Sequence, residues 1–216
     1  AELKITAYNL FQDLGLPVVV HINSIATPEE RQKYKMALVD YYRAKRSYLC
    51  EDCRRRLNKN PLRLLDCKQE QCQSIKDETP QIIDWLGEES KEHFTKVLEN
   101  LDELEVPYIL QSTLVRGLDY YTRTVFEIYP AETEAVVSEA PIQAGGQTAL
   151  GGGGRYDLLL EEMGGKPTPA AGFSLGVERA VSLLKQSCHE NKCKMPIKNF
   201  DAFLAQLGGQ ASKRGL

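Results

Sequence analysis

The segment 114–128 constrains the fold most, because a run of polar and aromatic residues leads directly into a strand pattern. Its end, Thr124 to Ile128, is mainly β-branched or aromatic and alternates in polarity, which predicts a β-strand. A purely structural strand has little need of the preceding Arg116-Gly117-Leu118-Asp119-Tyr120-Tyr121. Gly117 permits a close backbone approach, and Arg116 offers a planar guanidinium to a phosphate or carboxylate. We expect a binding site here; the alternative is an exposed loop with a cation–π pair.

Composition limits the class of protein. The chain has 216 residues, 26% charged and 42% hydrophobic, which is ordinary for a soluble globular protein of one large or two small domains. No apolar run approaches the roughly 20 residues of a membrane span, and residues 1–5 lack the pattern of a secretory signal. We therefore expect a cytoplasmic protein. Because the net charge is −3, any contact with nucleic acid needs a local basic patch.

Both ends of the sequence suggest a piece of a longer protein. Ala1 opens on a helical pattern without an initiating methionine, and residues 200–208 resemble the first strand of a further unit. Residues 210–214 then resemble the start of a helix. Since a strand without partners does not form a sheet, we expect the chain to be a fragment.

The N-terminal half predicts alternating elements. Residues 3–14 have helical apolar spacing and end at Gly15, a suitable residue after a helix, and residues 18–23 predict a strand. A second helix is expected from the Thr27-Pro28-Glu29-Glu30 start signal to about Leu49.

Four cysteines follow as Cys-x2-Cys, thirteen residues, then Cys-x4-Cys. Cys50, Cys53, Cys67 and Cys72 could close a tetrahedral zinc site, although the second pair is more widely spaced than usual. Reduced structural thiols are the alternative, so no metal is assigned to these residues from the sequence.

A basic run lies between the two cysteine pairs. It contains five cations and no acid, and could meet phosphates, with a solvated surface as the alternative. Its members are Arg54, Arg55, Arg56, Lys59 and Arg63. Helical apolar spacing continues beyond it, so we expect a helical insertion that ends near Val106-Pro107.

Consecutive glycines mark a second unusual segment. Gly151 to Gly154 weaken a strand by roughly 0.5–1 kcal/mol each relative to alanine, so we expect another body, a flat ligand, against this backbone. No Gly-Lys-Ser/Thr follows, which excludes a P-loop. Residues 130–143 before it predict a loop. Residues 170–179 predict a strand that turns into a helix with Arg179 in its first turn, where an arginine could reach a phosphate or simply face solvent.

Three motifs in order resemble the histidyl-tRNA synthetase family, which is a class II aminoacyl-tRNA synthetase family. Arg116 to Tyr121 and Gly153 to Asp157 resemble its two histidine signatures, and Gly172 to Arg179 resembles class II motif 3. Residues 60–66 resemble its insertion domain. The resemblance covers nearly the whole chain.

The resemblance implies an α+β fold, in which part of a class II antiparallel sheet has flanking helices and a helical insertion domain. The implied limits are 1–27 and 106–196 for the catalytic domain, 28–105 for the insertion, and 197–216 for the start of an anticodon-binding domain.

By resemblance, the chain belongs to a histidine–tRNA ligase that forms histidyl-adenylate from histidine and ATP, with Mg²⁺, and transfers histidine to tRNA(His). Arg116 would act on the α-phosphate of ATP, and Asp119 is our own candidate to orient Arg116 or a tyrosine. Histidine would be bound by Tyr120, Tyr121, Tyr156, Gly153 and Gly154. ATP would also contact Gly176 and Arg179, and the basic run would lie near the tRNA acceptor stem.

The sequence departs from the family pattern. Motifs 1 and 2, the Thr-x-Glu loop and most of the anticodon-binding domain are absent, and Leu158 stands where the family usually has glycine. We therefore expect this chain alone to be inactive and the intact protein to be a homodimer.

Three other functions remain open. One is the synthetase-like regulatory subunit of ATP phosphoribosyltransferase, whose members bind histidine but generally lack the insertion and the arginine at position 116. The second is a synthetase-like sensor domain of a kinase, which flanking sequence would reveal. The third is a zinc-stapled RNA-binding module built on residues 50–72, which metal analysis would reveal.

Overall fold

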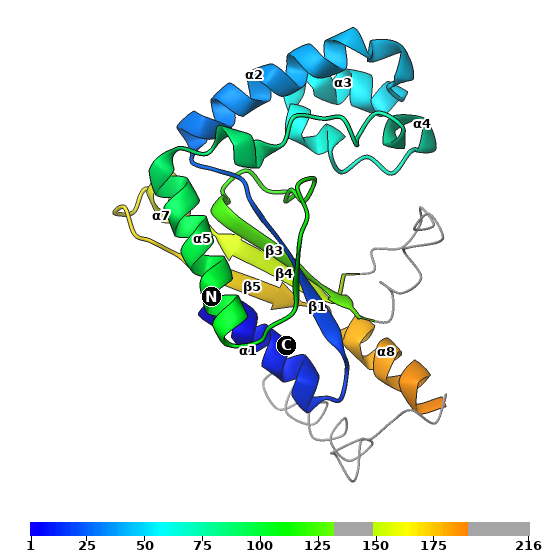
Figure 1. The fold of residues 1–216 in the computed structure, drawn as a ribbon, viewed down its shortest axis with the longest axis vertical. Coiled ribbons are helices and arrows are strands. Elements are labelled where there is room, and N and C mark those ends of the chain that lie inside the picture. The colour runs from blue at the N-terminus through cyan, green and yellow to red at the C-terminus, as the bar shows by residue number, and fades with distance from the viewer. Residues whose placement is uncertain (132–148, 190–216) are drawn as a thin grey trace.

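A computed structural model describes residues 1–131 and 149–189 of the chain (Figure 1). The loop predicted beyond Ala131 and the unit predicted over 197–216 lie outside these residues. The helices and 3₁₀ segments (η) are α1 (Glu2–Asp13), α2 (Pro28–Ala44), η1 (Arg46–Tyr48), α3 (Glu51–Lys59), η2 (Pro61–Leu64), α4 (Glu70–Gln73), η3 (Ile82–Trp85), α5 (Glu88–Glu103), α7 (Leu159–Glu162) and α8 (Val177–His189). The strands are β1 (Val18–Ser24), β2 (Tyr108–Leu110), β3 (Thr122–Pro130), β4 (Gly151–Arg155) and β5 (Ala171–Leu175).

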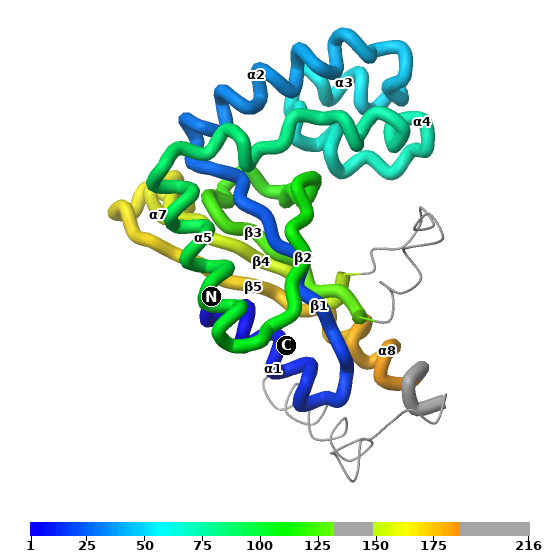
Figure 2. The backbone as a smooth tube through the Cα atoms, in the orientation of Figure 1, coloured from blue at the N-terminus to red at the C-terminus, as the bar shows by residue number. Residues whose placement is uncertain are grey.

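The five strands form one sheet in the order β2-β1-β3-β4-β5 (Figure 2). β2 is parallel to β1, and the other neighbours are antiparallel. This is the mostly antiparallel sheet of the predicted α+β class. In the centre, β3 pairs with β1 from Val18 opposite Pro130 to Ser24 opposite Thr124. The predicted strand after the Arg116 motif is therefore the central strand of the sheet.

Three helices share one core with the sheet. Phe11 of α1, Leu101 of α5 and Leu184 of α8 belong to a buried cluster with Ile22 and Phe126 from the central strands. Each fully buried side chain of this size contributes roughly 1.5–3 kcal/mol through removal from water. α5 falls inside the range 28–105 predicted for the insertion, yet it runs along the sheet (Figure 1), and its buried apolar residues Phe94 and Leu101 belong to this cluster.

The remaining helices of that range form a second body, whose buried cluster continues to the sheet through Leu114, Tyr121 and Val125. Residues from α2, α3 and the segments up to η3 pack together, including Tyr34, Leu38, Leu57 and Leu64. α2 begins at the predicted start signal, and Thr27 and Glu30 form a capping box there, because the Thr27 hydroxyl accepts from the amide of Glu30 and the Glu30 carboxylate accepts from the amide of Thr27. It ends earlier than predicted, since the chain turns through η1 and starts α3 with the Cys50 side chain as N-cap.

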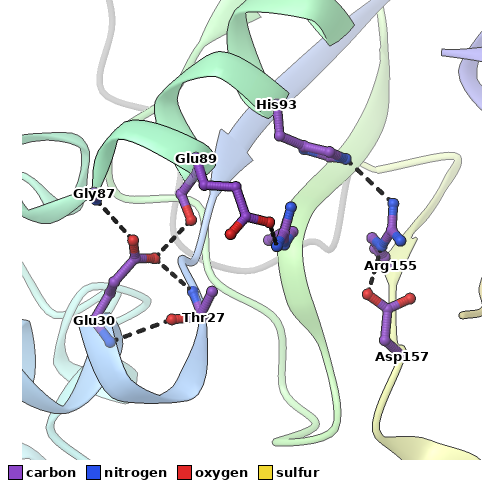
Figure 3. A network of polar contacts seen from close by, with 9 residues as sticks. Thr27, Glu30, Gly87, Glu89, His93, Arg155 and Asp157 are labelled. Carbon is purple, nitrogen blue, oxygen red and sulfur yellow. Dashed lines mark hydrogen bonds and ion pairs between the residues drawn. The ribbon is translucent and has the colours of Figure 1, made fainter. Parts of the chain in front are cut away.

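Glu30 also links the two bodies (Figure 3). Its carboxylate accepts hydrogen bonds from the Gly87 amide at 2.7 Å and the Ser90 hydroxyl at 2.8 Å, at the start of α5. Partial burial would favour the protonated form, but the donors from Thr27, Ser90 and Gly87 outweigh it and lower the pKa of Glu30. The ionised carboxylate thus fixes the start of α2 against the start of α5.

A buried cation lies on the helical side of the sheet. Lys4 is 6% exposed, and its ammonium lies 5.1 Å from the centroid of the Phe126 ring. Burial lowers the pKa of Lys4 to about 8, from 10.5 in the unfolded chain. The folded protein therefore carries the cost of burying this charge at neutral pH.

Replacing Lys4 with methionine is expected to stabilise the fold at pH 7 by roughly 1–3 kcal/mol, because the apolar chain stays buried and the charge is removed. Between pH 8 and 10.5 the unfolded lysine binds more protons than the folded one, so this residue's contribution to wild-type stability rises with pH. The advantage of Lys4→Met should shrink accordingly. Urea unfolding at pH 7 and pH 10 measures the difference in the free energy of unfolding between Lys4→Met and the wild type. The same difference at both pH values would contradict this role of Lys4.

Candidate functional site

The glycines of β4 accommodate two side chains on one face of the sheet. A Cβ added to Gly152 would lie 2.7 Å from Nη1 of Arg116, and one added to Gly154 would lie 2.9 Å from Cδ1 of Tyr121. The sequence led us to expect a flat ligand against this backbone. The structure shows that side chains of the protein itself already require these glycines.

Three tyrosines stand together beside the glycine strand. The ring centroids of Tyr120 and Tyr121 are 4.6 Å apart, and Tyr156 lies 5.8 Å and 6.0 Å from them at steep angles. A Cβ on Gly172 of β5 would lie 2.4 Å from the Tyr156 hydroxyl oxygen. The predicted histidine-site tyrosines, which come from two separate motifs, are thus brought into one aromatic cluster.

Arg116 is fixed by an acid on the central strand. Its Nη1 donates to Oε1 of Glu127 at 2.6 Å, with the two side chains 21% and 20% exposed. The hydroxyl of Tyr129 donates to the other Glu127 oxygen at 2.6 Å, and the guanidinium carbon lies 5.6 Å from the centroid of the Tyr121 ring. The guanidinium is therefore held in one place and partly desolvated, which strengthens its action on a nearby anion.

Asp119, which we predicted from the sequence to orient Arg116 or a tyrosine, has a different partner. It accepts a hydrogen bond from the side-chain amide of Asn60 at 3.2 Å, on the insertion side. Glu127 is the acid that pairs with Arg116, and its position inside the predicted strand was the available signal. A carboxylate among Val125, Phe126 and Ile128 needs a partner, because an unpaired buried charge is costly.

The insertion reaches the site through the segment after α3. A Cβ on Gly117 would lie 2.8 Å from Nη1 of Arg63, and Asn60 binds Asp119. Arg63 therefore adjoins the Arg116 motif, whereas the other cations of the basic run lie on α3. Of these, Arg54 donates to the carbonyl of Ser47 at 3.2 Å and is exposed.

The rest of the basic run faces solvent to different degrees. Arg55 is exposed and pairs with Asp52 one turn earlier on α3, which neutralises part of its charge. Lys59 at the end of the helix is exposed, and Arg56 is half-buried. Arg54 and Lys59 are thus the most available cations on this helix.

Arg155 belongs to a separate polar network (Figure 3). Its Nε donates to Asp157 at 2.5 Å, and its Nη1 lies 3.2 Å from Nε2 of His93 on α5. Asp157 also accepts from the amide of Ala170 at 3.0 Å. Burial and then the neighbouring Arg155 charge lower the pKa of His93. This network fixes the turn around Tyr156, and no sequence pattern pointed to His93.

The predicted strand-to-helix turn is present as β5 and α8. The Gly176 amide donates to the carbonyl of Leu150 at 2.8 Å, and Arg179 Nη1 donates to the carbonyl of Ala149 at 2.6 Å. A Cβ on Gly176 would lie 3.2 Å from Cδ of Arg179. Both residues are thus tied to the segment that enters the glycine strand.

The four cysteines of the insertion also come together. The Sγ atoms of Cys50, Cys53, Cys67 and Cys72 all lie within 4.8 Å of one another, and all four thiols are free.

None of the helices in residues 1–131 and 149–189 is long and apolar enough to cross a membrane.

The described fold matches that of a solved aminoacyl-tRNA synthetase. The solved structure of apo histidyl-tRNA synthetase from S. aureus is 30% identical, with a TM-score of 0.63, and the match covers 100% of this chain and 52% of that chain. A family model described as histidyl-tRNA synthetase matches residues 23–180. The chain belongs to the histidyl-tRNA synthetase family.

Curated relatives agree with this assignment. A histidine–tRNA ligase of Streptococcus agalactiae is 42% identical over 97% of this chain and 46% of its own length. One from Aquifex aeolicus is 46% identical over 85% of this chain and 43% of its own length. The chain thus spans about half the length of the curated relatives it matches.

Proposed function

We propose that the protein activates histidine with ATP, forming histidyl-adenylate and pyrophosphate, and then transfers histidine from the adenylate to the 3′ end of tRNA(His), releasing AMP. The observation that carries this proposal is the placement of Arg116. It is anchored to Glu127 above Gly152 and adjoins the tyrosine cluster, so an anion-stabilising group and a candidate amino-acid pocket share one face of the sheet.

In the first step the histidine carboxylate would attack the α-phosphorus of ATP. Negative charge builds on the equatorial phosphate oxygens as pyrophosphate leaves. A guanidinium that is already in position stabilises this charge without reorganising during the reaction. Arg116 has this property because Glu127 holds one of its nitrogens and the Tyr121 ring lies beside it.

Histidine would bind beside Tyr120, Tyr121 and Tyr156, with the backbone of Gly153 and Gly154 close by. Phenolic hydroxyls donate and accept hydrogen bonds, so with neighbouring groups they can match both imidazole nitrogens. Polar recognition of this kind rejects amino acids of similar shape better than apolar packing does, because a mismatched ligand leaves buried polar groups unpaired.

ATP would extend toward the β5–α8 turn. Gly176 and Arg179 stand at the first turn of a 13-residue helix, where free amides and the helix dipole favour an anion. Mg²⁺ would accompany ATP and neutralise part of the phosphate charge.

The tRNA would approach the insertion side. Arg54, Arg55, Arg56 and Lys59 lie on α3, and Arg63 follows it next to the Arg116 motif, so a phosphate backbone along α3 would lead toward the catalytic face. We also propose that the insertion domain is shorter than the expected 28–105 and comprises residues 28–86, because α5 packs in the core with the sheet. The complete protein is proposed to be a homodimer. We propose that the chain alone is inactive, because it spans about half the length of its curated relatives.

The experiment is tRNA charging by the protein expressed from its complete reading frame. Labelled histidine should enter acid-precipitable tRNA(His) only when ATP and Mg²⁺ are present. A folded protein that binds histidine and yet transfers none of it to tRNA would overturn the transfer step.

Replacing Glu127 with glutamine should lower the rate of adenylate formation by roughly tenfold or more, because Arg116 loses its ionic anchor while the shape of the strand is kept. The effect should appear mainly in kcat, since the anchor matters most when charge develops. Tyr129→Phe, which removes a donor to the same carboxylate, is a matched control expected to have a smaller effect. Equal rates for Glu127→Gln and wild type would contradict the anchoring role.

A further inference from the structure

The strongest unexplained feature outside the catalytic face is the cysteine cluster of the insertion. It draws on two stretches of chain, with Cys50 and Cys53 at the start of α3 and Cys67 and Cys72 beyond η2. The folding of the insertion brings all four Sγ atoms within 4.8 Å of one another. Three of the four side chains are buried and Cys50 is partly exposed.

We propose that Cys50, Cys53, Cys67 and Cys72 bind one structural zinc ion. Four thiolates around Zn²⁺, each about 2.3 Å from the metal, lie about 3.8 Å from one another in a tetrahedron. The Sγ atoms of Cys50 and Cys67 are 3.8 Å apart. A tetrahedral set of four sulfur ligands selects zinc or an iron–sulfur centre, and the absence of any open ligand position suits a structural zinc site.

The backbone around the cluster provides the hydrogen bonds that thiolates require. The Cys53 amide donates to Sγ of Cys50 at 3.4 Å, and the Cys50 amide donates to Sγ of Cys72 at 3.3 Å. Cys50 is the N-cap of α3, and the positive end of this nine-residue helix favours negative sulfur. Four bound thiolates carry more negative charge than one Zn²⁺ ion neutralises. Amide donors to the sulfur atoms therefore lower the free-energy cost of forming the site.

A cation stands beside the cluster as well. Lys76 is partly buried, and its ammonium donates to the carbonyl oxygen of Cys67, whose carbonyl also accepts from the Gln73 amide at 2.8 Å. One zinc ion with four thiolates carries a net charge of −2, so a nearby ammonium is favourable. Four thiols that served only as small apolar side chains would gain nothing from this polar arrangement.

α3 would link the bound zinc ion to the catalytic face. α3 starts at the cluster and ends at Lys59, and Asn60 directly after it binds Asp119 of the Arg116 motif. Binding requires four deprotonated cysteines and releases their protons, so its free energy adds to the stability of the fold. The zinc would therefore hold α3, with its basic residues, against the rest of the insertion.

The test is elemental analysis of the protein expressed from its complete reading frame in zinc-supplemented medium and exchanged into chelator-free buffer. About one zinc ion per chain is expected. The variant Cys67→Ser/Cys72→Ser should lose it, whereas Cys188→Ser, which changes a cysteine that is not one of the four proposed ligands, should keep it. A strong chelator should lower the unfolding temperature of the wild type and of Cys188→Ser.

A second measurement covers the case in which the double variant fails to fold. Wild-type protein grown with cobalt should show the visible absorption of tetrahedral cobalt–thiolate coordination, and zinc should displace it. The proposal is overturned if supplemented wild type holds no stoichiometric metal, if it holds iron, if the four cysteines are recovered as disulfides, or if the folded double variant retains the same zinc content.

Discussion

Replacing Arg116 with alanine should lower the rate of histidine-dependent ATP–pyrophosphate exchange by on the order of 10²–10³-fold. The guanidinium of Arg116 lies over Gly152 of β4 and is held by Glu127 at 2.6 Å. Without it, the negative charge that develops on the transferring phosphate loses this hydrogen-bond donor. The loss should be larger in kcat than in the KM for histidine, because Arg116 acts on the phosphate rather than on the imidazole.

Two further variants sharpen this test. Arg116→Lys keeps the charge but loses the planar fork, so it should recover only part of the rate. Arg43→Ala, which removes an exposed arginine of α2 paired with Asp40, should exchange like the wild type. If Arg116→Ala matched Arg43→Ala, the electrophilic role of Arg116 would be wrong.

Replacing Gly153 with alanine should destabilise the fold by roughly 3 kcal/mol or more, which is at the upper end of overpacking effects. The added Cβ would lie 2.1 Å from the carbonyl oxygen of Gly172 and 2.6 Å from Cα of Phe173. Both atoms belong to the backbone of β5, so the clash can be relieved only by moving a strand. The midpoint of urea unfolding, followed by circular dichroism, measures the change.

Gly117→Ala is the matched control for this stability measurement. Its added Cβ would meet only the guanidinium end of Arg63, which can rotate away, so the cost should stay below about 1 kcal/mol. Equal unfolding midpoints for the two alanine variants would show that β4 and β5 are less closely packed than the structure indicates.

The elements that could be predicted from sequence are those whose signals are local. The Thr27-Pro28 start signal marks the observed beginning of α2, and residues 170–179 become a strand and then a helix. The alternating residues after Tyr121 form the central strand, because β-branched and aromatic side chains suit a pleated surface; the structure buries Val125 on one face of this strand and Phe126 on the other. The resemblance of three motifs then supplied the fold class, which the structure confirms.

The features that could not be predicted depend on contacts between distant segments. The pairing of Arg116 with Glu127 follows from how the loop folds back over β3, and that of Arg155 with His93 from the packing of α5 on the sheet. Helical periodicity in α5 showed an apolar face but not which core would bury it. The glycines of β4 gave a clear signal of close approach without revealing that Arg116 and Tyr121 were the approaching groups.

The most direct test of the central claim is ATP–pyrophosphate exchange by the protein expressed from its complete reading frame, with each of the standard amino acids in turn. Exchange that requires histidine and falls to background with every other amino acid is the predicted result. A folded protein that binds histidine but exchanges no pyrophosphate with any of them would contradict adenylate formation and favour a regulatory, non-catalytic member of the same fold.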